Sequence, residues 1–364
     1  MKLGLALGYS GARLDLPVGL VALAERLGFD SVWTAEAYGS DAITPLAYLA
    51  AKTDRIRLGT GIMQLAGRPA AMFAMQAQTV DALAGGDRVI AGLGVSGPQI
   101  VEGWYGQPWG RPYFQLRDYI QIVRKIFARE APVSHEGSEL SLPYAGEGST
   151  GLGKPLRSIL HTNPEVPIWL GAGGEATTRL SGELCQGLLP LSFVPGDFAD
   201  LAGLVEEGFR RAGNGKGWND FEVNASVSVE VTDDIDGALA RFKPQIALYI
   251  GGMGAREANF HNQRMVRAGF GDEAQKIQEL YLAGRRDEAT AAVPDDYVDA
   301  RVLVGPPERI RARYRAWADS GITGLNLDTR APAVLELMAD VAKETPAIGP
   351  EAALLRLSPE PRAR

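Results

Sequence analysis

The stretch Pro-Ile-Trp-Leu-Gly-Ala-Gly-Gly-Glu-Ala-Thr-Thr at residues 167–178 is the clearest β-to-α unit of the chain. Residues 167–172 form a short apolar run that predicts a strand, and residues 175–184 predict a helix. A glycine-rich turn lies between them. A turn of this kind that opens a helix presents free backbone N–H groups to an anion. The stretch therefore predicts a phosphate seat at the carboxyl end of a strand.

Units of the same kind recur on both sides of this stretch. Short apolar runs predict eight strands, at residues 3–8, 30–34, 55–61, 88–93, 167–172, 187–193, 221–231 and 322–327. Helical spacing of apolar residues fills the intervals between them. Strands that alternate with helices pair in parallel through right-handed crossovers, and eight of them close naturally into a barrel. The sequence therefore predicts an α/β fold, a (β/α)8 TIM barrel, with a doubly wound open sheet as the alternative.

Two segments interrupt this rhythm. Residues 133–142 alternate like a β-ribbon, and residues 143–165 form a long loop rich in Gly, Pro and Ser. After the seventh strand, a helical stretch at 236–292 is broken by glycines. We therefore expect a single barrel domain over residues 1–344, with insertions after strands 4 and 7, the first at about 133–166. Residues 345–364, which contain four prolines, are expected to form a C-terminal extension that is a surface segment or partly disordered.

The composition argues against several classes of protein. The formal net charge of −7 argues against a nucleic-acid binder, which needs a basic face. No apolar run reaches the length of a membrane span. The single cysteine, Cys185, cannot form an internal disulfide and indicates a reducing compartment. The three histidines are scattered, so we expect no metal site. A soluble cytoplasmic protein is the simplest expectation.

Two carboxylates follow the second strand, at the end of the barrel where functional groups gather. The carboxylate of Glu36 could hydrogen-bond a ring or a substrate. Asp41 stands directly before a helix and is interpreted as its cap. In the third strand, Gly59 and Gly61 indicate a bulge or a close approach of the backbone.

Glycine-rich loops follow the fourth and fifth strands. Residues 92–97 read Gly-Leu-Gly-Val-Ser-Gly, a match to GxGxxG, but this dinucleotide pattern usually opens the first βα unit. We interpret it as a loop that lets a cofactor approach backbone amides, with a Rossmann fold as the alternative. Its candidate binding residues are Gly94, Val95, Ser96 and Gly97. In the phosphate seat, the hydroxyls of Thr177 and Thr178 can add donors, while a plain βα turn is the competing interpretation.

Taken in order, these segments resemble the bacterial luciferase-like superfamily. The resemblance rests on residues 29–33 (FDSVW), 58–62 (LGTGI), 167–174 (PIWLGAGG) and 304–310 (VGPPERI), and it extends over about residues 1–328. It implies a cis peptide bond between Gly61 and Ile62, which bulges under the cofactor ring. It also implies a cofactor phosphate held by Ala172, Gly173 and Gly174, and a homodimer.

Within the superfamily, residues 94–104 (GVSGPQIVEGW) and 249–254 (YIGGMG) resemble the branch that uses coenzyme F420, a 5-deazaflavin. The chain departs from the glucose-6-phosphate dehydrogenase members of that branch in two places. Ala37 follows Glu36 where those enzymes carry a catalytic His, and residues 192–197 lack the Lys that holds the sugar phosphate there. The departures argue against glucose 6-phosphate as the substrate and leave Glu36 as the candidate catalytic residue.

The leading hypothesis is an oxidoreductase that transfers a hydride between reduced F420 and a small organic substrate, with a separate reductase supplying the reduced cofactor. Gly61 and Ile62 would contact the ring, Glu36 its edge or the substrate, and residues 94–97 and 173–178 the tail. The first alternative is a two-component monooxygenase that uses FMNH₂. The second is a non-catalytic flavin-binding barrel.

Overall fold

A computed structural model describes residues 1–253 and 259–357 of the chain. Gly254, the last residue of the YIGGMG motif, and residues 358–364 of the tail lie outside the described residues. The chain divides into two compact units, one of residues 1–96, 100–226 and 316–364 and the other of residues 97–99 and 227–315. The single domain expected over 1–344 stays a prediction.

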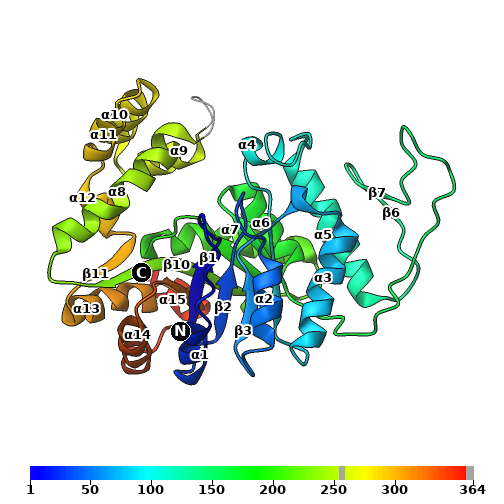
Figure 1. Ribbon diagram of the computed structural model, residues 1–364, viewed down its shortest axis with the longest axis horizontal. Coiled ribbons are helices and arrows are strands. Elements are labelled where there is room, and N and C mark those ends of the chain that lie inside the picture. Colours follow the sequence, from blue (N-terminus) through cyan, green and yellow to red (C-terminus); the bar gives the residue numbers. More distant parts are fainter. Residues whose placement is uncertain (254–258, 358–364) are drawn as a thin grey trace, which may run out of the picture. The chain divides into compact units, whose positions relative to one another are not determined.

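The first unit contains a closed parallel barrel (Figure 1). Its strands are β1 (Lys2–Gly8), β2 (Ser31–Thr34), β3 (Arg57–Thr60), β5 (Val89–Gly94), β8 (Ile168–Ala172), β9 (Gly187–Pro190), β10 (Glu222–Val231) and β12 (Gly324–Asp328). Parallel pairing runs from β12 through β1 to β9, and the β9–β10 and β10–β12 pairs close the ring. The predicted (β/α)8 barrel is confirmed. A two-residue strand, β4 (Met63–Gln64), pairs with β5 and was not predicted.

Helices follow the barrel strands along the chain and bury one face each. They are α1 (Val18–Arg26), α2 (Ile43–Ala50), α3 (Ala70–Leu83), α5 (Pro112–Ala128), α6 (Glu175–Leu184), α7 (Phe198–Ala212) and α14 (Pro332–Glu344). Within the tail, Pro350–Leu357 forms a further helix, α15, that packs against α7, and the C-terminal extension stays a prediction. Ala353 of this helix is buried, and the burial of its apolar surface stabilises the helix.

Large aromatic side chains fill the interior of the barrel. The rings of Trp33 and Trp169 lie 5.2 Å apart and pack with Ile90. A Cβ at Gly59 would lie 2.4 Å from the Trp33 ring, so this strand position admits only glycine. The close approach that was predicted for Gly59 is therefore confirmed.

Charged side chains close the amino-terminal end of the barrel. Arg57, at the start of β3, forms ion pairs with Asp30 at 2.6 Å and with Glu222, at the start of β10, at 2.9 Å. Lys2 adds a second contact to Glu222 at 2.9 Å. Burial works to lower the pKa of Arg57, but its two carboxylate partners outweigh burial and raise it. These ion pairs cover the amino-terminal end of the barrel, and ligands of such barrels bind at the opposite end, at the carboxyl termini of the strands.

The insertion after the fourth barrel strand contains the predicted ribbon. Its strands β6 (His135–Glu136) and β7 (Ser141–Leu142) are antiparallel. Asp118 of α5 anchors the ribbon by accepting the N–H groups of Glu139 at 2.7 Å and Leu140 at 2.9 Å. Burial alone would raise the pKa of Asp118, but these two N–H donors and His135 outweigh it and lower the pKa.

The second unit is largely helical and holds the insertion after the seventh barrel strand. It comprises α8 (Ile235–Gly252), α9 (Phe260–Arg267), α10 (Gly271–Leu282), α11 (Arg286–Ala291) and α12 (Asp295–Asp299), with β11 (Val302–Gly305) paired to the second half of β10. Strand β11 was not predicted. The expected breaks near Gly252 and Gly271 are confirmed, and a Cβ at Gly251 would lie 2.4 Å from Tyr281 of α10. No helix within the described ranges is both long and apolar enough to span a bilayer.

Candidate active site

The rim of the barrel holds a cis peptide bond directly after β3. The bond joins Gly61 and Ile62, as the family resemblance implied. The Gly61 N–H donates to the carbonyl of Thr34 at 2.6 Å, which ties the bond to the end of β2. The side chain of Ile62 fills space left by two glycines, because a Cβ at Gly94 or at Gly171 would lie 2.8 Å from it. Three predicted site residues, Gly61, Ile62 and Gly94, therefore come together at one place.

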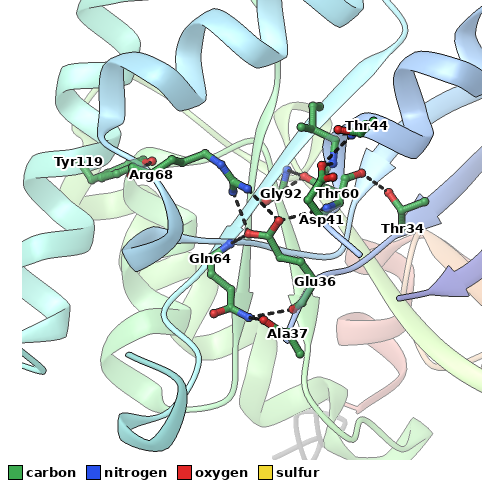
Figure 2. Close-up of polar contacts among 12 residues, drawn as sticks. Thr34, Glu36, Ala37, Asp41, Thr44, Thr60, Gln64, Arg68, Gly92 and Tyr119 are labelled. Carbon is green, nitrogen blue, oxygen red and sulfur yellow. Dashed lines mark hydrogen bonds and ion pairs between the residues drawn. The ribbon is translucent and has the colours of Figure 1, made fainter. Parts of the chain in front are cut away.

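Glu36, the candidate catalytic residue, lies at the same rim and is fully engaged (Figure 2). Its Oε1 accepts the Gln64 N–H at 2.6 Å, and its Oε2 accepts the Ala42 N–H at 3.0 Å. Arg68 donates to both oxygens at 2.8 Å in a bidentate pair. The two side chains are almost closed to water, with 3% of Glu36 and 10% of Arg68 exposed. A carboxylate with four donors is suited to hold its surroundings in place.

Arg68 is the central residue that the sequence did not reveal. Burial works to lower its pKa, but hydrogen bonds and charge from Glu36 outweigh burial and raise it. Tyr119 of α5 donates its hydroxyl to the Arg68 carbonyl at 3.0 Å, so the backbone of this residue is held as well (Figure 2). The only signal available was its place in Gly67-Arg68-Pro69, directly before a helix.

Asp41 has the capping role that was expected. Its Oδ1 accepts the N–H groups of Ile43 at 3.0 Å and Thr44 at 2.8 Å, in the first turn of α2 (Figure 2). The backbone is therefore fixed at Glu36 itself, by the Gln64 side chain, which donates to the Glu36 carbonyl at 2.9 Å, and again at the cap formed by Asp41.

Tyr105 approaches the same rim from the loop after β5. A Cβ at Gly67 would lie 3.1 Å from its hydroxyl oxygen. Partial burial raises the pKa of Tyr105, and the charge of Glu36 raises it further. The hydroxyl therefore keeps its proton at neutral pH and can donate a hydrogen bond. Its neighbour in sequence, Trp104, is exposed to solvent.

The glycine-rich turn at residues 172–178 has the form of an anion seat. Gly174 is the N-cap of α6, and Thr178 is the first residue whose N–H bonds back to the Gly174 carbonyl, at 3.0 Å. The first-turn N–H groups before it have no acceptor inside the helix. The hydroxyls of Thr177 and Thr178 also donate to the Gly174 carbonyl, at 2.9 and 3.0 Å, which leaves their lone pairs outward. Their predicted role as extra donors needs a rotation of these hydroxyls.

The loop after β5 begins in an unusual conformation. Ser96 has a φ of +69°, a left-handed value that non-glycine residues rarely adopt. Gly94, Val95 and Ser96 belong to the first unit and Gly97 to the second. The parallel barrel overturns the Rossmann alternative for this GxGxxG segment.

Comparison with known proteins agrees with the resemblance that the sequence showed. The model of a family described as luciferase-like monooxygenase matches residues 2–324. The chain belongs to the luciferase-like monooxygenase family. Within this family it is 47% identical over 329 residues to a Mycobacterium tuberculosis protein named as a candidate coenzyme F420-dependent oxidoreductase, covering 89% of this chain and 93% of that protein. It is 28% identical to a 5,10-methylenetetrahydromethanopterin reductase of Methanolobus tindarius, covering 83% and 86%.

Solved structures agree on the luciferase-like fold. The coenzyme F420-dependent tetrahydromethanopterin reductase of Methanopyrus kandleri matches with a TM-score of 0.74 at 22% identity, covering 93% of this chain and 97% of that one. A monooxygenase of Streptomyces bottropensis matches with a TM-score of 0.65 at 20% identity, covering 94% and 99%. The chain is therefore an oxidoreductase of the luciferase-like class.

Proposed function

We propose that this luciferase-like enzyme transfers a hydride between reduced coenzyme F420 and a small organic substrate. The observation that carries the choice of cofactor is the 47% identity to the M. tuberculosis relative over almost the whole of both chains. The geometry supports it, because the cis Gly61–Ile62 bond and the glycine-rich turn before α6 lie at the carboxyl ends of barrel strands.

The residues present fit such a cofactor. The turn before α6 offers neutral backbone N–H groups and a helix N-terminus, the donor set that suits a phosphate. The cofactor supplies hydride chemistry when it is bound. Gly61 and Ile62 would support its ring, Gly94 to Gly97 would line its approach, and Ala172 to Gly174 with Thr177 and Thr178 would hold its phosphate. The four hydrogen bonds that the Glu36 carboxylate accepts favour a role in holding the rim in place, not a role in proton transfer. The catalytic role of Glu36 stays a prediction.

The test is a side-by-side fluorescence titration of the purified protein with F420 and with FMN. Selective micromolar binding of F420, followed by oxidation of reduced F420 with an electron-poor substrate, is the expected result. Selective binding of FMN would overturn the proposal and favour the monooxygenase, for which oxygen consumption with reduced FMN is the diagnostic. Tight F420 binding without turnover across a broad panel of substrates would favour the non-catalytic barrel.

The phosphate seat makes a separate prediction. The change Ala176→Glu, at an exposed position in the first turn of α6, is expected to weaken F420 binding about tenfold, because a carboxylate repels the phosphate there. Affinity for the deazaflavin chromophore without its phosphate tail is expected to stay unchanged. The matched control is Ala352→Glu, at an exposed position in the first turn of α15. Equal loss for both ligands would place the phosphate elsewhere.

Three further expectations belong to this proposal. A separate reductase supplies the reduced cofactor, the protein forms a homodimer, and it works in the cytoplasm. Gel filtration with light scattering tests the dimer, and a mass of one chain would contradict it.

A further inference from the structure

A cavity of about 140 Å³ lies at the carboxyl ends of β1 and β2, apart from the residues assigned to the cofactor. Its walls include Gly8 at the end of β1 and Thr34 at the end of β2. Thr34 also accepts the Gly61 N–H at 2.6 Å, and Gly8 accepts the Ala35 N–H at 2.9 Å. A residue of the cavity wall, Thr34, is therefore hydrogen-bonded to the cis peptide where the cofactor ring would lie.

The walls are held together by short polar contacts. Ser10 and Ser40 exchange hydrogen bonds, from the Ser10 N–H to the Ser40 hydroxyl at 2.9 Å and from the Ser40 N–H to the Ser10 hydroxyl at 3.0 Å. Gly39 allows this approach, since a Cβ there would lie 2.6 Å from the Ser10 carbonyl oxygen. The loop after β1 and the loop after β2 are therefore held against each other and form one wall of the cavity.

Two arginines line this cavity in a chain of net charge −7. Arg330 is fixed in place, because it donates to the carbonyls of Ala6 at 3.1 Å, Leu7 at 2.6 Å and Thr329 at 3.3 Å. A guanidinium has five N–H donors, so these bonds leave donors over. Arg13 has no carboxylate partner among the described residues. Asp15 is the acidic side chain of the lining, so the formal charge of the two arginines and Asp15 together is +1.

We propose that this cavity binds the carboxylate of a small organic acid and that the substrate of the enzyme is such an acid. A surplus of one positive charge matches a monoanion, and guanidinium groups bind carboxylates with strong, charge-assisted hydrogen bonds. The volume is well above the roughly 10–15 Å³ that a single water molecule needs, which leaves room for a carboxylate with a short carbon chain. Leu14, Leu16 and Pro45 supply apolar contacts for that chain. That the bound acid is a substrate rests on the proposed oxidoreductase function. That the cavity binds a carboxylate does not depend on it.

The experiment is calorimetric titration of the protein, without added cofactor, with crotonate and with its neutral counterpart crotonamide. We expect crotonate to bind at least tenfold more tightly than crotonamide, with an affinity that falls as salt is raised. Arg13→Gln should weaken crotonate binding about tenfold, because a charged hydrogen bond is lost. Asp15→Asn should strengthen it, because a like charge leaves the wall. Crotonamide binding should change little in either variant.

The matched control is Arg55→Gln, an exposed arginine two residues before β3, at the amino-terminal end of the barrel. It should leave crotonate binding unchanged. Equal affinity for crotonate and crotonamide, or equal effects of Arg13→Gln and Arg55→Gln, would overturn the proposal. Tighter binding of methyl phosphate than of crotonate would overturn the choice of a carboxylate.

The outcomes separate this inference from the proposed function. Loss of the anion preference in a protein that still binds F420 removes the carboxylate site alone. A preference for crotonate that depends on Arg13, in a protein that does not bind F420, leaves the site standing and removes the proposed function.

Discussion

Replacing Arg68 with alanine should lower the free energy of unfolding by about 3–5 kcal/mol, the usual cost of removing one partner of a buried ion pair. The change leaves Glu36 with its side chain 3% exposed and without its bidentate counter-charge. The backbone N–H groups of Ala42 and Gln64 remain, but they carry no full charge. Urea denaturation at neutral pH, followed by circular dichroism, measures the effect.

Two control variants make this prediction specific. The double change Glu36→Gln with Arg68→Met removes both charges together and should recover more than half of the lost stability, because no unpaired charge remains buried. Arg111→Ala removes an arginine that is 61% exposed from its pair with Glu139, and it should cost less than about 1 kcal/mol. If Arg68→Ala costs no more than Arg111→Ala, the pair does not hold the rim.

Gly92→Ala is expected to abolish folding of the barrel. A Cβ at this position would lie 1.7 Å from the carbonyl oxygen of Thr60, a backbone atom of β3. The two residues are also bonded twice, since the Thr60 hydroxyl donates to the Gly92 carbonyl and accepts the Gly92 N–H, both at 2.8 Å. Because β3 and β5 are paired within a closed barrel, neither can move away without breaking other pairs.

The measurements for this prediction are the soluble yield and the thermal transition. Gly19→Ala is the control, because nothing lies within 4 Å of a Cβ there and the residue is in the exposed part of α1. It should be neutral or stabilising by up to about 1 kcal/mol, since alanine is the better helix former. A soluble Gly92→Ala protein that melts with the natural protein would contradict the steric argument.

The sequence predicted the barrel because each strand and helix carries its own local pattern. Eight apolar runs alternate with helices, and the parallel ring follows from their order. The strands it missed are short, with two residues in β4 and four in β11, and such runs carry little periodic signal. The closure of the amino-terminal end could not be predicted, because Arg57 and Glu222 are 165 positions apart and meet only in the folded ring.

The candidate site was predicted where its signals are local. The glycine turn before α6 and the Gly61–Ile62 bond are each read from a few adjacent residues. The engagement of Glu36 could not be read in this way, because its carboxylate is bound by Arg68, 32 positions later, and by a backbone N–H of Gln64. A carboxylate at a strand end looks the same in sequence whether it is free or paired.

The paired indoles inside the barrel provide an intrinsic optical reporter of the rim. The rings of Trp33 and Trp169 lie 5.2 Å apart and are tilted by 42°, and a Cβ at Gly61 would lie 3.5 Å from the Trp33 ring. Their ultraviolet emission arises within a few ångströms of the cis peptide, and Arg57 of the amino-terminal ion pairs lies over the Trp169 ring at 5.8 Å. A chromophore that binds at the rim and absorbs in the near ultraviolet or blue would quench them by resonance energy transfer. Occupancy of the site can thus be followed in the natural protein without any attached label.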